Sequence, residues 1–96
     1  IELKVTPQKG MGFEEIAGII ARFDEVESVY LMSGTCDIAL TVTGKTFKDV
    51  AMFVAHRLAP LDSVQSTSTS FVLRTYKELG VFVSFDEMDE REVATL

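Results

Sequence analysis

The chain has 96 residues, a length typical of one domain, and its 15 acidic and 9 basic side chains give a formal net charge of −6. Its Lys and Arg residues are scattered, which argues against direct nucleic-acid binding, because phosphate contacts need clustered positive charge. No apolar run approaches the ~20 residues that cross a bilayer. A single cysteine excludes an internal disulfide and favours a reducing, cytoplasmic location.

The first half of the chain predicts a strand, a helix and a second strand. Alternating apolar residues indicate a strand over residues 1–6. A helix is expected over about residues 12–22, where apolar side chains recur at helical spacing. The next strand is predicted over residues 26–33, with Tyr30 and Met32 on the face opposite to the core.

The second half repeats this order. A turn at residues 33–36 leads to a third strand over residues 37–43. Thr46 is a good N-cap for a second helix, which Pro60 ends because proline lacks a backbone N–H. A long fourth strand is predicted over residues 64–76.

Two strand–helix–strand halves make the βαββαβ plan of an α+β, ferredoxin-like sandwich. The plan places both helices on one face of a four-stranded antiparallel sheet. Tyr30 and Met32 would leave an apolar patch on the other face, which predicts a homodimer that pairs through that face. The alternative is that residues 81–85 fold back over it.

The predicted domain covers residues 1–80. Residues 81–96 are expected to form an acidic C-terminal tail, with a short strand followed by a frayed helix or a mobile end. The five acids and one base of residues 86–96 carry most of the net charge.

Catalytic and metal chemistry find little support in the sequence. Cys36 and His56 are the only soft metal ligands, too few for a zinc site, so we expect no metal and no cofactor. Their separation does not bring them together as a nucleophile and base, so no catalytic residue is expected. A polar turn at residues 33–37 and a hydroxyl-rich strand at residues 66–70 are the remaining polar features. Together they suit a small zwitterion, although such a strand can simply be a solvated face.

Four stretches together resemble the C-terminal effector-binding (RAM) domain of Lrp/AsnC transcriptional regulators: residues 3–7, 26–37, 53–64 and 66–77. The resemblance implies homodimers that assemble into tetramers or octamers. It also implies that an amino acid or similar effector binds near the interfaces between dimers. Full-length members bind DNA through an N-terminal helix-turn-helix domain, which this chain lacks. The initial isoleucine therefore suggests a domain excised from a longer regulator.

The resemblance places effector contacts on the turn and the last strand, at Gly34, Thr35, Cys36, Asp37, Thr67 and Thr69. The family's turn usually reads Gly-x-aromatic-Asp, so Cys36 in place of the ring predicts a reshaped pocket. Phe53 and Arg57, at i and i+4 on the second helix, are candidates for effector selectivity. Two other functions remain open: an enzyme of the dimeric α+β barrel type, monooxygenase-like, and a purely structural oligomerisation module.

Overall fold

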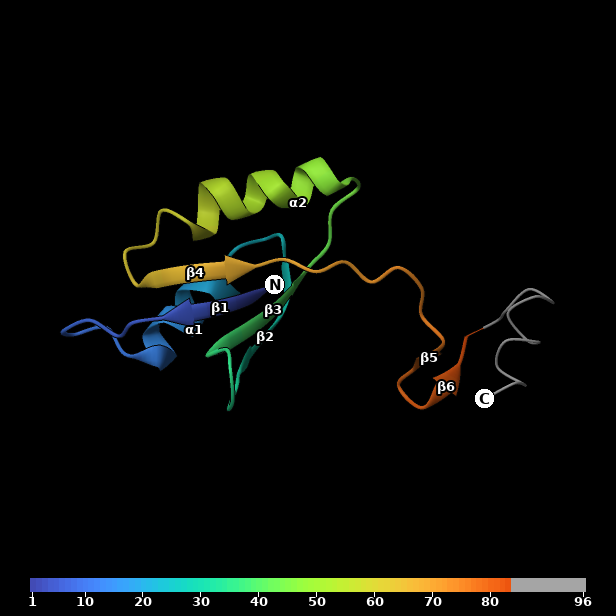
Figure 1. The fold of residues 1–96 in the computed structure, drawn as a ribbon, viewed down its shortest axis with the longest axis horizontal. Coiled ribbons are helices and arrows are strands. Elements are labelled where there is room, and N and C mark those ends of the chain that lie inside the picture. The colour runs from blue at the N-terminus through green and yellow to red at the C-terminus, as the bar shows by residue number, and fades with distance from the viewer. Residues whose placement is uncertain (84–96) are drawn as a thin grey trace.

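The computed structural model describes residues 1–83 as a sheet with both helices on one face, followed by a projecting C-terminal arm (Figure 1). The antiparallel sheet has the strand order β2-β3-β1-β4. Its strands are β1 (Glu2–Val5), β2 (Val26–Leu31), β3 (Ile38–Val42) and β4 (Val64–Ser68). The helices are α1 (Phe13–Ala21) and α2 (Phe47–Phe53), and α2 continues as the π-helix η1 (Val54–Leu58). This order confirms the predicted ferredoxin-like α+β fold.

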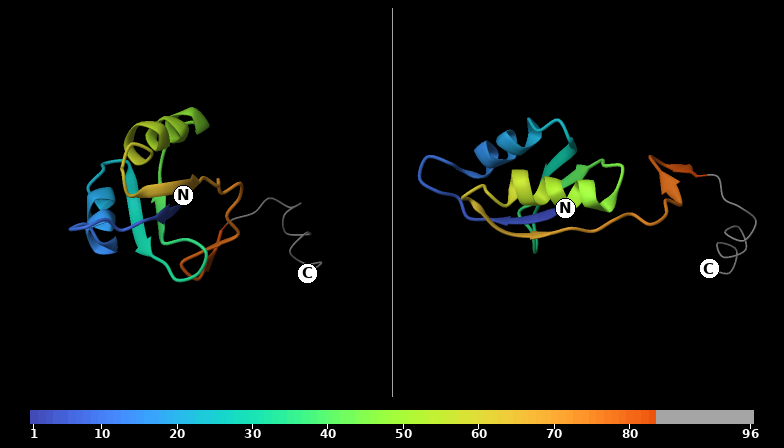
Figure 2. Two further views of the ribbon diagram at one scale, coloured as in Figure 1. Left: turned by 60° about the vertical axis from the view of Figure 1, so that its left-hand side comes forward. Right: turned by 90° about the horizontal axis from the view of Figure 1, so that it is seen from above.

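Figure 2 shows α1 and α2 lying over one face of the sheet. The buried side chains come from both layers, so the core lies between them. The alternation predicted for the first strand holds, since Leu3 and Val5 are buried while Glu2 and Lys4 are exposed. The buried cluster consists of Leu3, Val5, Ile16, Ile20, Ile38, Leu40, Phe53 and Leu58. Leu31 alternates with Tyr30 and Met32 and should by that pattern face the core, but it is exposed at the end of β2 and lies outside this cluster.

The second helix begins as the sequence predicts and ends with a wider turn. The backbone N–H of Asp49 donates to Thr46 Oγ1 over 3.1 Å, which caps the helix. At the other end the N–H of Ala59 donates five residues back, to Val54 O, over 2.8 Å. Pro60 then stops the helix because it cannot donate at all. The helix prediction is confirmed, with its last turn as a π-helix.

The prediction of a long fourth strand over residues 64–76 is wrong, because β4 ends at Ser68. Its sheet partner β1 is short, and Glu2 pairs with Ser68 at the last position of the register. Beyond that point the segment from residue 69 to residue 76 has no strand beside it. The consecutive apolar residues Phe71, Val72 and Leu73 therefore lie on a segment without a sheet partner.

Residues 69–83 form the arm, which leaves the body and ends in a hairpin (Figure 1). The hairpin pairs β5 (Lys77–Glu78) with β6 (Val81–Phe82), which places β6 at the start of the predicted tail. The predicted boundary between residues 80 and 81 falls within the hairpin. The acidic residues of the predicted tail lie outside the described part of the chain.

The outer face of the sheet is not covered by the arm. Tyr30 and Met32 on this face are 59% and 43% exposed. Val81 and Phe82, which were the alternative cover, sit on the projecting hairpin and are themselves exposed. Residues 1–83 therefore leave the outer face of the sheet uncovered, and residues 84 and 85 of the alternative cover lie outside the described part of the chain.

Candidate functional site

The turn at residues 33–37 lies where β2 passes into β3. Gly34 adopts a φ of 110°, which explains a glycine at this position. Asp37 Oδ2 accepts a hydrogen bond from the backbone N–H of Val5 over 2.9 Å, and its own N–H donates to Leu3 O over 2.9 Å. The side chain predicted to bind an effector therefore also fastens the turn to β1.

Cys36 is a buried residue of the same turn. Desolvation, reinforced by the neighbouring carboxylates of Glu2 and Asp37, raises the pKa of the Cys36 thiol. The thiol is therefore protonated at neutral pH, the opposite of what an activated nucleophile requires. His56 lies near the other end of β3, where it lines a cavity together with Val42.

The two threonines predicted to bind an effector lie on β4 and at the start of the arm. Thr67 pairs with Leu3 of β1 and is exposed. Thr69 lines a cavity of about 280 Å³, together with Ile1, Leu40 and Phe71. Thr69 thus belongs to the end of the sheet where β3 runs into α2.

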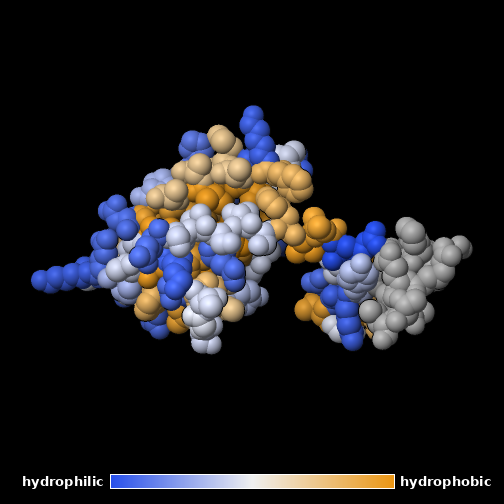
Figure 3. Space-filling model, viewed as in Figure 1, coloured by the Kyte–Doolittle hydropathy of each residue, from blue (hydrophilic) through white to orange (hydrophobic). Residues whose placement is uncertain are grey.

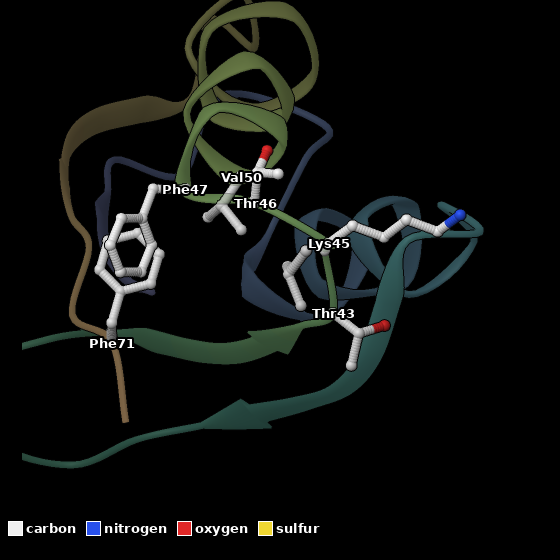
Figure 4. A pocket seen from close by; sticks show the side chains of 8 residues that line it. Thr43, Lys45, Thr46, Phe47, Val50 and Phe71 are labelled. Atoms are coloured by element: carbon white, nitrogen blue, oxygen red, sulfur yellow. The ribbon is translucent and has the colours of Figure 1, made fainter. Parts of the chain in front are cut away.

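Two larger cavities flank the loop between β3 and α2, residues 43–46. The first, which we call the phenylalanine pocket, measures about 530 Å³. The rings of Phe47 and Phe71, 4.5 Å apart between centroids and tilted by 53°, form one wall of it (Figure 4). Its lining comprises Val42, Thr43, Gly44, Lys45, Thr46, Phe47, Val50 and Phe71.

Gly44 shapes the loop between these cavities. A Cβ atom at this position would lie 3.1 Å from Val50 Cγ2 and 3.3 Å from Asp49 Cβ. The absence of a side chain lets the loop approach the first turn of α2. The Thr46 cap fixes the same turn from the other side of the loop.

The second cavity, which we call the Glu25 pocket, measures about 480 Å³. Ionisable groups of both signs line it, together with apolar side chains. The lining comprises Glu25, Val42, Thr43, Gly44, Lys45, Asp49, Met52, Phe53, His56 and Arg57. The two candidate selectivity residues, Phe53 and Arg57, are therefore both on its wall.

Phe53 and Arg57 converge on the segment between α1 and β2. Phe53 packs edge-on against Phe23, with ring centroids 6.0 Å apart. The Arg57 guanidinium lies 5.3 Å from the centroid of the same ring, and its Nε is 3.7 Å from Glu25 Oε2. The ion pair is partly exposed, so its contribution to stability is small. It fixes Arg57 at the rim of the Glu25 pocket.

The candidate residues therefore form three groups rather than one site. Gly34, Thr35, Cys36 and Asp37 occupy the β2–β3 turn. Thr67 and Thr69 follow the edge strand, and Phe53 and Arg57 line the Glu25 pocket. Within one chain the turn lines none of the three cavities at the β3–α2 end of the sheet.

Sequence reasoning missed several lining residues. The phenylalanine pocket depends on Phe71, which the wrong strand prediction had assigned to a regular sheet. The Glu25 pocket depends on Glu25, Lys45 and Met52. One pattern in the sequence pointed to this region. Gly44 lies two residues before the helix cap Thr46, which indicates a short, closely packed loop between β3 and α2. No local pattern distinguishes Glu25 from the other acids of the chain.

Residues 1–83 contain no cluster of three or more His, Cys, Asp or Glu side chains that could hold a metal ion. None of the helices in that range is long and apolar enough to span a bilayer.

A family model described as the Lrp/AsnC ligand binding domain matches residues 1–82. A relative in Bacillus subtilis (strain 168), an uncharacterised HTH-type transcriptional regulator YugG, is 48% identical over 95 residues, which are 99% of this chain and 57% of the relative. A proline dehydrogenase transcriptional activator of Rhizobium radiobacter is 26% identical over 80 residues, covering 83% of this chain and 51% of that protein.

An HTH-type transcriptional regulator of Pyrococcus furiosus is 30% identical over 80 residues, again 83% of this chain and 51% of the relative. The chain thus spans about half the length of these curated relatives. No solved structure matched it.

Proposed function

Because this chain belongs to the Lrp/AsnC ligand-binding domain family, we propose that it is the effector-binding and oligomerisation domain of a transcriptional regulator. The effector is an amino acid or a similar small molecule, bound near an interface between copies. DNA binding is the task of a separate helix-turn-helix domain of the full regulator, which goes with the expected cytoplasmic location. The family match over residues 1–82 is the observation that carries this proposal.

The cavities around the β3–α2 loop support small-molecule binding. The two larger ones measure about 530 and 480 Å³, within the range of small-ligand pockets. Their walls combine aromatic and aliphatic side chains with a few polar groups, as such pockets usually do. The turn around Asp37 could join a site only if a second copy covered it, because in one chain it is open.

The exposed apolar side chains support self-association. Phe71, Val72 and Leu73 emerge from the body on the arm, and the last two are 83% and 90% exposed. The segment appears orange in Figure 3 as it leaves the body. Together with Tyr30 and Met32 on the sheet face, it offers surface that a homodimer would cover. Tetramers or octamers would follow from further contacts between such dimers.

A thermal-shift screen of the chain against the twenty amino acids tests effector binding. A ligand at 100 times its Kd adds about 2.7 kcal/mol to the stability of the folded state. For a domain of this size that raises Tm by roughly 10–20 °C.

A rise in Tm with one or a few amino acids, reproduced by isothermal titration, is the expected result. If none of the twenty changes Tm while the chain still oligomerises, effector binding by an amino acid is wrong and the purely structural module is favoured.

A further inference from the structure

The outward side of α2 and η1 is apolar, although it faces solvent. A helix on the surface of a domain usually turns charged and polar residues outward. Here the exposed side carries an aromatic ring, a thioether and three small side chains, and Phe47 and Met52 are 68% and 47% exposed. An apolar patch of this kind usually marks a contact surface. We call it the α2 face, and it consists of Phe47, Ala51, Met52, Ala55 and Ala59.

Positive charge borders the α2 face at the end where the β3–α2 loop enters the helix. Lys45 and Lys48 are exposed, and neither forms an ion pair with another of residues 1–83. Arg57, near the other end of the helix, is paired with Glu25. Asp49 is the single acid of α2 and η1. In Figure 3 the surface over α2 has mostly apolar colours, and blue hydrophilic side chains stand out from it.

The last residues of the chain have the complementary composition. Residues 84–96 hold five acids and one base, whereas residues 44–83, which include α2 and the arm, hold three acids and five bases. The family model ends at residue 82, so these last residues lie beyond what the family shares. A segment that mixes acids with apolar residues complements an apolar face bordered by lysines. Its apolar residues are Phe85, Met88, Val93 and Leu96.

The arm determines which α2 face this segment meets. The arm ends at Val83, whose N–H donates to Tyr76 O, and it leads away from the α2 of its own chain (Figures 1 and 2). Fully extended, residues 84–96 span up to about 45 Å, whereas α2 and η1 together are about 18 Å long. The segment is therefore long enough to cover the face. Docking on its own chain would require it to turn back along the arm, whereas docking on a second copy requires no such reversal.

We propose that residues 84–96 of one copy dock on the α2 face of a second copy. The apolar side chains of the segment cover Phe47, Met52 and the three alanines, and its carboxylates lie beside Lys45 and Lys48. This inference rests on the self-association within the proposed function, and it does not depend on which effector binds. It gives the acidic end of the chain a role in holding copies together.

A tryptophan placed in the segment tests the contact, because the chain has none of its own. In the full chain with Leu96→Trp, the emission maximum should lie to the blue of that of the same chain unfolded in urea, since docking removes the indole ring from water. The maximum should move to the red when dilution dissociates the copies. It should also move to the red in about 1 M salt, where the screening length falls to about 3 Å.

Two surface substitutions in the same background test charge and apolar contact separately. Lys48→Glu reverses one cation beside the face and should abolish the blue shift. The helix itself should not weaken, because the helix dipole favours an acid in the first turn. Met52→Gln removes apolar surface from the middle of the face and should reduce the blue shift. The matched control is Lys9→Glu, the same charge change at an exposed position before α1, which should leave the emission unchanged.

Cross-linking identifies the copy to which the segment binds. An equal mixture of isotope-labelled and unlabelled full chains is treated with a carbodiimide, which joins neighbouring carboxylates and amines directly. Mass spectrometry should find residues 84–96 joined to Lys45 or Lys48 in peptides that carry both isotopic compositions. Cross-linked peptides of a single isotopic composition would show docking within one chain and would overturn the proposal.

The remaining outcomes separate this inference from the proposed function. If the chain assembles but the emission equals that of the unfolded chain, the inference is overturned and the proposed function stands. A blue shift that survives both Lys48→Glu and Met52→Gln also overturns the inference, because the segment then docks elsewhere. A chain that light scattering shows to be monomeric throughout contradicts the self-association in the proposed function, and the inference fails with it.

Discussion

Asp37 has two tasks in this molecule, one in the fold and one predicted in function. Its carboxylate holds the backbone N–H of Val5 over 2.9 Å, which closes the turn onto the central strand. A hydrogen bond to a charged group contributes about 1.5–3 kcal/mol to the stability of the folded state. Loss of ligand response in an Asp37 variant therefore has to be separated from loss of stability.

Replacing Asp37 by Ala should lower the free energy of unfolding by about 1–2 kcal/mol, because the partly buried N–H of Val5 loses its acceptor. Urea denaturation measures this change. Asp37→Asn keeps an oxygen at the same place and should recover part of it. A stability equal to that of the parent in Asp37→Ala would show that the hydrogen bond does not contribute.

Single residues were predictable where a local rule decides them. The Thr46 cap needs only the backbone N–H of Asp49, three residues further along the chain. The burial of Leu3 and Val5 follows from the alternation of apolar and polar residues in β1. Phe53 and Phe47 were not predictable in this way. Phe53, proposed as a selectivity residue, is 5% exposed and belongs to the core, whereas Phe47, an equally apolar residue of the same helix, is 68% exposed. Their burial depends on Phe23 and Phe71, which come from distant parts of the chain.

At the scale of elements, the strands and helices of the body were predictable from the spacing of their apolar residues. These residues alternate with polar ones in the strands and recur every three or four positions in the helices. The length of β4 was not, because a strand needs a partner as well as a pattern. Only β1 borders β4, so the register ends at Glu2 and Ser68. β5 and its pairing with β6 were missed for a related reason, since a two-residue strand carries too little alternation to detect.

The turn of this hairpin gives a prediction at the same scale. Leu79 and Gly80 both have positive φ, 49° and 79°, the backbone of a tight two-residue hairpin turn. A leucine in this conformation is strained, and its side chain is 96% exposed, so little packing compensates. Leu79→Asn should therefore stabilise the hairpin by about 0.5–1 kcal/mol.

Amide hydrogen exchange at Val83 measures the stability of the hairpin, because the Val83 N–H donates to Tyr76 O across it over 3.1 Å. Exchange should slow about two- to fivefold in Leu79→Asn. Exchange as fast as in the parent would mean that the turn does not limit hairpin opening.

At the scale of the whole molecule, the arm holds much of the exposed apolar surface while the body has a closed core. A small domain gains stability by covering such surface in a complex. We expect light scattering to give at least a dimer for the chain. Chain truncated after Ser68 should dissociate toward monomer at concentrations where the parent remains assembled.

A double substitution, Tyr30→Ser with Met32→Ser, tests the sheet face separately from the arm. It should also weaken assembly if the dimer pairs through that face, while Leu31→Ser at the end of the same strand serves as the control. A parent chain that scatters as a monomer throughout would contradict self-association through either surface.

Ile1 lies at the same end of the sheet as the pockets and the root of the arm. Its terminal nitrogen donates to Leu40 O over 2.8 Å, and its side chain lines the cavity shared with Thr69 and Phe71. Any polypeptide attached ahead of Ile1 would consequently start at the rim of this cavity. The first residue of such an attachment would be held to the sheet through the two hydrogen bonds between Ile1 and Leu40.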